Sequence, residues 1–181
     1  MAQKKVIWLF GLSGAGKTTI AKSLSKIFIQ KNIQHLILDG DEIRNTVNKD
    51  LGFSNEDRKE NIRRSAEFAK LVSQQDINCI CAFITPLKML RDIVRTTLSE
   101  NVMIFYIDTP LEECAKRDVK GFYKKALNNE IPDFTGITAN FEFPENEPDV
   151  IKISTANRTP DDCANEIFSF IEKNKLDKSK I

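Results

Sequence analysis

Five short apolar runs recur along the chain, separated by longer segments with another periodicity. The runs are 6–10 (VIWLF), 35–39 (HLILD), 78–84 (NCICAFI), 102–108 (VMIFYID) and a weaker one at 149–155 (DVIKIST). They place apolar residues on both faces instead of alternating them with polar residues, as buried parallel strands do. The pattern therefore predicts about five strands of one parallel sheet.

The segments between these runs have the apolar spacing of helices. They cover 17–31, 55–75, 86–100 and 159–175. Ser54 and Asp57 offer a cap for the second helix, Pro86 suits the first turn of the third, and Thr159 offers a cap for the fourth. Strands that alternate with helices predict an α/β fold, a doubly wound parallel sheet with flanking helices and right-handed crossovers.

The segment 117–148 interrupts this alternation. It is rich in charge, proline and glycine and contains no strand pattern. Because long excursions in compact domains are usually lids or binding loops, we expect a lid at about 117–140. The length of 181 residues, without a repeat or a linker, indicates a single domain over 1–181 with a short polar tail at about 174–181.

The composition of the chain argues against binding to nucleic acids or membranes and against a metal site made of cysteines. Lys and Arg number 27 against 26 Asp and Glu, so we expect no bulk attraction to nucleic acids or membrane surfaces. No signal peptide is visible, and no apolar run approaches the roughly 18 residues of a membrane span. The four cysteines lack metal-site spacing, and we interpret them as plain buried or surface thiols of a reduced, cytoplasmic protein.

The stretch between the first strand and the first helix carries a phosphate-binding motif. GLSGAGKTT at 11–19 fits G-x-x-x-x-G-K-[ST], in the strand–loop–helix context that the motif requires. The glycines let backbone N–H groups turn toward phosphate oxygens, and the helix N-terminus adds partial positive charge. We predict a nucleoside triphosphate site made by Gly11, Ser13, Gly14, Ala15, Gly16, Lys17, Thr18 and Thr19, with Lys17 at the β and γ phosphates and Thr18 at Mg²⁺.

The residues after the second strand point to a phosphoryl acceptor. In DGDEIR at 39–44, Asp39 and Asp41 emerge at the carboxyl end of a strand, where ligands bind in open α/β sheets. Two carboxylates there can hold a hydrated Mg²⁺ and orient or deprotonate a hydroxyl; an Asx turn with Asp41 as helix cap explains them equally well. A base signature of GTP switches is missing from a suitable place, which favours a small-molecule kinase.

The helix at 55–75 carries Arg58 and Asn61 three residues apart, hence on one face. Arginine matches anionic oxygens with two parallel hydrogen bonds, although a solvated helix face is the simpler explanation of these residues alone. Phe53 and Phe134 are likewise explained, without further information, as aromatics that anchor loops.

Seven blocks in order resemble the adenylylsulfate kinase family, over about 4–172. They are GLSGAGKTT, DGDEIR, LGFSNEDRKENIRR, FITP, IDTPLEEC, RDVKGFYKKA and FTGI. The resemblance implies a P-loop kinase fold and an enzyme that phosphorylates adenosine 5′-phosphosulfate (APS) on its 3′-hydroxyl to give PAPS, with ATP and Mg²⁺, in sulfate activation. It also implies a homodimer and a functional link to an ATP sulfurylase.

The same resemblance implies roles for single residues. Asp39 is expected to act on the 3′-hydroxyl, and Mg²⁺ to be held by Thr18 with Asp39 or Asp41 through water. Phe53 and Phe134 match the two aromatics that sandwich the adenine of APS, and Arg117 belongs to the lid motif beside ATP. The other residues expected at APS are Asp41, Arg44, Arg58, Asn61, Ile84, Thr85 and Lys120.

Two positions depart from the family pattern. Thr85 stands where the family commonly has a serine that has been regarded as a phosphoryl acceptor, and Glu42 replaces the usual asparagine. Thr85 keeps a hydroxyl as a catalytic candidate, but direct transfer to the substrate makes an enzyme-bound intermediate unnecessary. Two alternative functions stay open. One is a P-loop kinase that acts on another small hydroxylated substrate. The other is a non-catalytic nucleotide sensor, against which intact Lys17, Thr18 and Asp39 argue.

Overall fold

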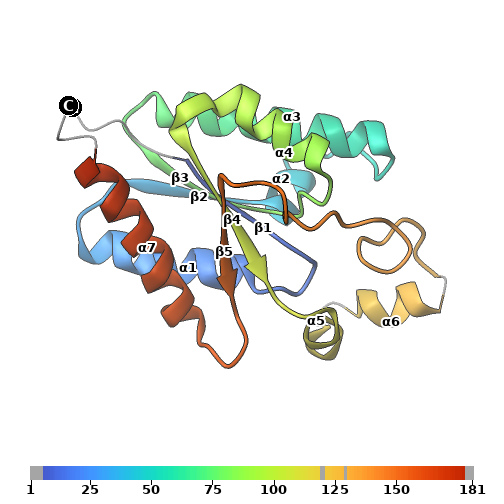
Figure 1. Ribbon diagram of the computed structural model, residues 1–181. Helices are drawn as coiled ribbons and strands as arrows, with labels where there is room; N and C mark the ends of the chain where they lie inside the picture. Colours follow the sequence, from blue (N-terminus) through green and yellow to red (C-terminus); the bar gives the residue numbers. More distant parts are fainter. Residues whose placement is uncertain (1–5, 119–120, 129, 178–181) are drawn as a thin grey trace.

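The computed structural model describes residues 6–118, 121–128 and 130–177. In this part of the chain a five-stranded sheet lies between two layers of helices (Figure 1). Every strand pairing is parallel, and the order is β2-β3-β1-β4-β5. The strands are β1 (Val6–Phe10), β2 (His35–Asp39), β3 (Asn78–Phe83), β4 (Val102–Asp108) and β5 (Val150–Ser154). The predicted fold class is confirmed.

Strand β1 occupies the centre of the sheet because it is apolar on both faces. All five of its residues are fully buried. Its last residue, Phe10, pairs with Phe83 of β3 and Tyr106 of β4, so three strands end at one edge of the sheet. The loops that follow these strands are therefore neighbours, although they are far apart in the sequence.

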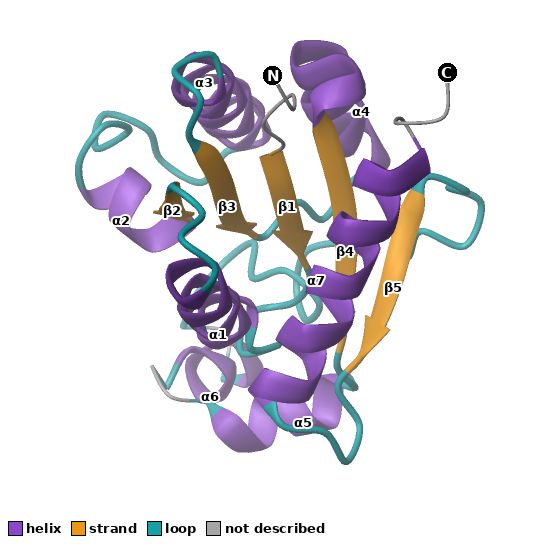
Figure 2. Ribbon diagram, turned by 90° about the vertical axis from the view of Figure 1, so that its left-hand side faces the viewer, coloured by secondary structure: helices purple, strands orange, loops and turns teal. Residues whose placement is uncertain are grey.

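Helices cover both faces of the sheet (Figures 1 and 2). On one face lie α1 (Lys17–Gln30) and α7 (Pro160–Asp177), and on the other α3 (Asn55–Ser73) and α4 (Lys88–Leu98). The predicted caps of α3 and α7 are confirmed. The hydroxyl of Ser54 accepts the N–H of Asp57 at 3.1 Å, and that of Thr159 accepts the N–H of Asp162 at 3.1 Å.

Two predicted helix boundaries are wrong. Helix α4 begins at Lys88, after an extended Leu87, and Pro86 lies outside it. The reason is that the carbonyl of Pro86 accepts hydrogen bonds from Arg91 and from the N–H of Glu142, which hold it away from the helix. Helix α7 continues to Asp177, so residues 174–177 of the expected tail are helical, and 178–181 lie outside the described residues.

The periodicity did not predict three short helices, α2 (Gly40–Asn45), α5 (Leu111–Arg117) and α6 (Phe122–Leu127), or a 3₁₀ turn, η1 (Ser99–Asn101), that follows α4. Helices α5 and α6 lie together beyond the carboxyl ends of the strands, and α2 lies apart, beside β2 (Figure 2). Each of these elements is too short for its apolar residues to repeat. Helix α6 lies within the segment expected to be a lid, and that function of the segment stays a prediction.

The four cysteines are free and buried in the described structure. Burial raises the pKa of the Cys79 thiol to about 12 and that of Cys81 well above its ordinary value. Burial also raises the pKa of Cys114 and Cys163. Thiolates are the reactive form, so all four are packing residues of low reactivity. As for membranes, none of the described helices has the length and apolar character needed to cross a bilayer.

Candidate active site

The loop at 11–16 turns tightly between β1 and α1, and its glycines permit the turn. Gly16 has a φ of 97° and stands directly before α1. A Cβ at Gly11 would lie 2.7 Å from the carbonyl oxygen of Ile107. No side chain forms a capping hydrogen bond at the start of α1 in the described structure, so the N–H groups of its first turn are available to an anion.

Lys17 folds back over this loop. Its Nζ donates hydrogen bonds to the carbonyl oxygens of Gly11 at 3.1 Å and Leu12 at 2.6 Å, and the side chain is largely buried. Thr18 beside it is half-buried, and Thr19 is exposed. The ammonium group therefore already lies against the phosphate-binding loop.

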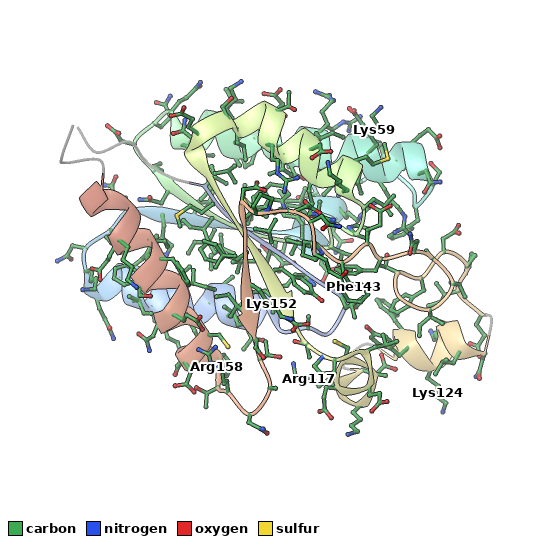
Figure 3. All side chains as sticks on the ribbon, viewed as in Figure 1. Lys59, Arg117, Lys124, Phe143, Lys152 and Arg158 are labelled. Atoms are coloured by element: carbon green, nitrogen blue, oxygen red, sulfur yellow. The ribbon has the colours of Figure 1, made fainter. Side chains whose placement is uncertain are left out.

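Three side chains from later segments hold the outer side of the loop. The hydroxyl of Tyr123 in α6 donates to the carbonyl of Ser13 at 2.8 Å, and that of Thr109 donates to the carbonyl of Ala15 at 2.9 Å. Arg117, labelled at the end of α5 in Figure 3, donates to the carbonyl of Gly14 at 3.3 Å. The sequence reasoning singled out Arg117 but missed Tyr123 and Thr109, although both lie in family blocks.

A carboxylate and a hydroxyl meet at the end of β2. Thr18 Oγ1 donates to Asp39 Oδ2 at 2.6 Å, while Asp39 Oδ1 accepts the N–H of Asp41 at 2.9 Å. Asp39 is thus the cap of α2, and Asp41 lies in the first turn, which corrects the helix-cap alternative. The Thr18–Asp39 pair supplies the hard oxygen atoms that Mg²⁺ prefers beside phosphates and water.

Two arginines enclose the loop that carries Phe53. The guanidinium carbon of Arg44 lies 4.6 Å from the centre of the Phe53 ring, and its Nη1 donates to the carbonyl of Gly52 at 2.7 Å. Arg58 Nε donates to the carbonyl of Phe53 at 2.9 Å. Burial, then repulsion from Arg58, lowers the pKa of Arg44, and burial lowers that of Arg58. This concentration of positive charge favours an anionic ligand.

Arg58 also reaches the loop that carries Phe134. Its Nη1 donates to Thr135 Oγ1 at 3.0 Å, and its Nη2 donates to the carbonyl of Asp133. The Phe134 ring packs edge-on against Tyr123 at 4.9 Å. One arginine therefore joins the loops of the two candidate adenine-binding aromatics. A pocket of about 260 Å³ opens beside it, lined by Asn55, Arg58, Pro86, Leu87, Asp133, Ala139 and Asn140.

The side chain of Asn61, in contrast, is buried and already hydrogen-bonded to another residue of the chain. It is 5% exposed, and its Oδ1 accepts a hydrogen bond from Asn48 Nδ2 at 3.0 Å. Asn48 is fully buried, and its own Oδ1 has no hydrogen-bond partner among the described residues. The pair joins α3 to the loop after α2, and a contact of Asn61 with APS stays a prediction.

The segment after β3 presents one exposed and one buried residue. Ile84 is 38% exposed, whereas Thr85 is fully buried. Thr85 Oγ1 accepts a hydrogen bond from Trp8 Nε1 at 3.0 Å. The hydroxyl that was a phosphoryl-acceptor candidate is therefore enclosed in the core. Lys120 lies outside the described residues.

The three adjacent strands β2, β3 and β1 bring these groups together at one edge (Figure 2). Strand β1 leads to the phosphate loop, β2 to Asp39, and β3 to Ile84 and Thr85. A larger hollow of about 440 Å³ lies by α2 and Phe68; Asp39 is among its lining residues, whereas no residue of the phosphate loop is. The arrangement places the phosphate loop near Asp39, and the carboxylate, two arginines and two aromatics named above remain candidates for an acceptor site.

Comparison with known proteins gives consistent results. The family model described as adenylylsulphate kinase matches residues 3–152. An adenylyl-sulfate kinase of Bacillus licheniformis is 44% identical over 94% of this chain and 86% of its own, and one of Clostridium kluyveri is 46% identical over 92% and 82%. The structure of the Mycobacterium tuberculosis APS kinase in complex with AMPPNP and APS superposes with a TM-score of 0.89, at 35% identity, covering 95% of this chain and 99% of the other.

Proposed function

This chain belongs to the adenylylsulphate kinase family, and we propose that it transfers the γ-phosphoryl group of ATP to the 3′-hydroxyl of APS through the residues described above. It is an ATP-dependent adenylyl-sulfate kinase. The observation that carries the residue assignment is the direct contact of Thr18 with Asp39, which joins the donor loop to the acceptor side of the site.

The phosphate loop binds the triphosphate of ATP. The N–H groups at the start of α1 and the ammonium group of Lys17 face the phosphates. Lys17 exchanges its bonds to the carbonyls of Gly11 and Leu12 for bonds to charged phosphate oxygens, which are stronger acceptors. Arg117 approaches the same loop from α5 and supplies a further positive charge near ATP.

Asp39 acts on the acceptor hydroxyl. Its carboxylate is largely buried and fixed by Thr18 and by the N–H of Asp41, so it holds one orientation. A carboxylate in this position accepts the proton that the 3′-hydroxyl loses as it attacks the γ-phosphorus in line. Thr18, with Asp39 or Asp41 through water, would hold Mg²⁺. The ion would neutralise charge between the β and γ phosphates.

The residues of the acceptor side recognise APS. Arg44 and Arg58 offer guanidinium groups to the phosphate and sulfate oxygens, which relieves the repulsion between the two cations. Phe53, which is 65% exposed, gains an adenine to stack on, and Phe134 provides the opposite wall. Thr85 has no phosphoryl-accepting role in this proposal, because its hydroxyl is buried against Trp8.

Comparing acceptors tests the assignment of APS. Release of ADP from ATP would be measured with APS, with AMP, and with sugars or hydroxy acids as acceptors. We expect strong release with APS alone, since AMP lacks the sulfate that faces the arginines. Release with a sugar or hydroxy acid, and none with APS, would support the other P-loop kinase instead.

The proposal extends to assembly. We expect a homodimer, which light scattering on the purified chain measures directly. A functional link to an ATP sulfurylase remains a prediction from the resemblance, and a cytoplasmic location remains a prediction from the cysteines and the sequence composition. Both are consistent with an enzyme that consumes APS and ATP.

A further inference from the structure

A buried arginine that the catalytic assignment does not use lies behind the APS subsite. Arg91 of α4 is fully buried, and Glu147, from the segment before β5, is 8% exposed. Arg91 Nε lies 3.0 Å from both carboxylate oxygens of Glu147, and Nη2 lies 2.5 Å from Oε1. Hydrogen bonds from Arg91 and Arg95 outweigh the burial of Glu147 and hold its pKa below the ordinary value, so the pair is ionic.

The remaining donor of Arg91 is directed at the chain beside the candidate substrate site. Its Nη1 donates to the carbonyl oxygens of Thr85 and Pro86, both at 3.1 Å. Its guanidinium carbon also lies 5.0 Å from the centre of the Phe10 ring, and Phe10 directly precedes the phosphate loop. Arg91 thus contacts the ends of two strands that lead into the site.

The segment that returns from the lid region, residues 142–147, is bonded to the start of α4 and to the chain just before it. The N–H of Glu142 donates to the carbonyl of Pro86 at 2.8 Å, and Glu142 Oε2 accepts the N–H of Lys88 at 2.5 Å. With Glu147 bound to Arg91, this segment is attached at both of its ends to the start of α4. Pro86 and Leu87 line the pocket beside Arg58, so movement of this chain would change the pocket directly.

Fold stability alone does not account for such an ion pair. Two charges lose their hydration in the interior, and replacing a buried pair by apolar residues of similar volume is often neutral or stabilising. The geometry of Arg91 suggests why the buried ion pair is present: a planar guanidinium can bond a carboxylate and two carbonyls at once in fixed directions.

We propose that Arg91 is a positioning residue for APS binding: by holding the carbonyls of Thr85 and Pro86 together with the carboxylate of Glu147, it fixes the Ile84–Leu87 segment against the segment that returns from the lid region. The inference rests on the proposed function for its consequence in catalysis, whereas the fixed segment itself follows from the contacts.

The kinetic test replaces the pair by residues of similar volume, Arg91→Met with Glu147→Leu. We expect this double variant to fold, to raise the KM for APS about tenfold or more, and to change the KM for ATP less than about twofold. Asp92→Asn is the matched control, since Asp92 lies half-buried on the same helix and accepts hydrogen bonds from Lys88 and Arg95. A folded double variant with a KM for APS like that of the control would overturn the inference.

A second measurement needs neither turnover nor the double variant. In Glu147→Gln, hydrogen exchange at the amides of Ile84, Thr85 and Leu87 should be about tenfold or more faster than in wild type, while Asp92→Asn leaves it unchanged. Equal exchange in all three proteins would refute the fixed segment, even if the wild type turns APS over. If the wild type does not use APS but exchange rises as expected, the proposed function fails together with the role of Arg91 in APS binding, and only the fixed segment stands.

Discussion

At the scale of single residues, several side chains of the candidate site have both a structural and a proposed functional role. Asp39 caps α2 and also accepts a hydrogen bond from Thr18, and Arg58 joins two loops and is proposed to bind APS. Replacing such a residue by alanine is uninformative, because the loss of its side chain changes the fold and the chemistry together. The informative substitutions are therefore those that keep the structural role of a residue and remove its proposed catalytic or binding role.

Asp39→Asn is such a substitution. Asparagine is as good a helix cap as aspartate, so the hydrogen bond from the N–H of Asp41 and the melting temperature should be kept. The amide cannot accept the proton of the 3′-hydroxyl, so kcat should fall by about 10² to 10⁴, with smaller changes in ATP and APS binding. Steady-state kinetics and calorimetry measure the two effects. A kcat within threefold of wild type would exclude Asp39 as the base.

Phe53→Ala separates binding from stability in the same way. The ring is 65% exposed, so the free energy of unfolding should change by no more than about 0.5 kcal/mol. Loss of adenine stacking should weaken APS binding by about 1–3 kcal/mol. Isothermal titration calorimetry with APS would measure this loss of affinity. Leu71→Ala is the control, because Leu71 lies on α3 and is 60% exposed. Equal APS affinity in both variants would remove Phe53 from the site.

At the scale of elements, the short helices beyond the sheet edge decide how the phosphate loop is held. The loop receives hydrogen bonds from α5, from α6 and from Thr109, between β4 and α5. Helix α6 also supplies Tyr123, on which Phe134 packs. One short helix thus connects the ATP side of the site with the loop of a candidate APS-binding aromatic.

Tyr123→Phe tests this connection. The ring and its contact with Phe134 remain, whereas the hydroxyl is lost together with its hydrogen bonds to the carbonyl of Ser13 and to the Cys114 thiol. A net hydrogen bond is worth about 0.5–1.5 kcal/mol, which corresponds to a rise in KM for ATP of about twofold to tenfold. Tyr106→Phe, which changes the chain's other tyrosine, should leave that KM at the wild-type value. If both variants behave alike, α6 does not support the phosphate loop.

The elements differ in how well the sequence predicts them, for physical reasons. Strands such as Val6–Phe10 and the cap at Ser54 are local patterns, and both are confirmed. Helix α4 begins two residues later than the pattern predicts, because the Pro86 carbonyl is held by residues 5 and 56 positions away. Long-range contacts of this kind leave no local signal. The P-loop motif, by contrast, is contained in one stretch of sequence.

At the scale of the whole molecule, buried charge links the sheet to the segment that returns before β5. Glu147 is ionised in the folded protein with a lowered pKa, so its ionic form stabilises the fold above the ordinary carboxyl pKa of 4.5. This stabilisation is lost as the pH falls through the lowered value. The contribution is absent from a variant with a neutral side chain there.

Comparing melting temperatures of wild type and Glu147→Gln at several pH values tests this. The difference should be largest near pH 7 and should shrink below pH 4.5. Glu60→Gln is the control. Its neighbours Arg63 and Arg64 lower the pKa of Glu60 to about 2, yet the cluster lies at the surface, where ion pairs add little stability. A pH-independent difference for Glu147→Gln would contradict an ionic pair.

The most direct test of the account is the identity of the product made from ATP and APS with Mg²⁺. We expect one molecule of ADP to be released for each APS consumed, and a nucleotide product heavier by one phosphoryl group that carries it on the 3′-oxygen. ADP release that does not depend on APS, or a product phosphorylated elsewhere, would contradict the placement of the 3′-hydroxyl beside Asp39.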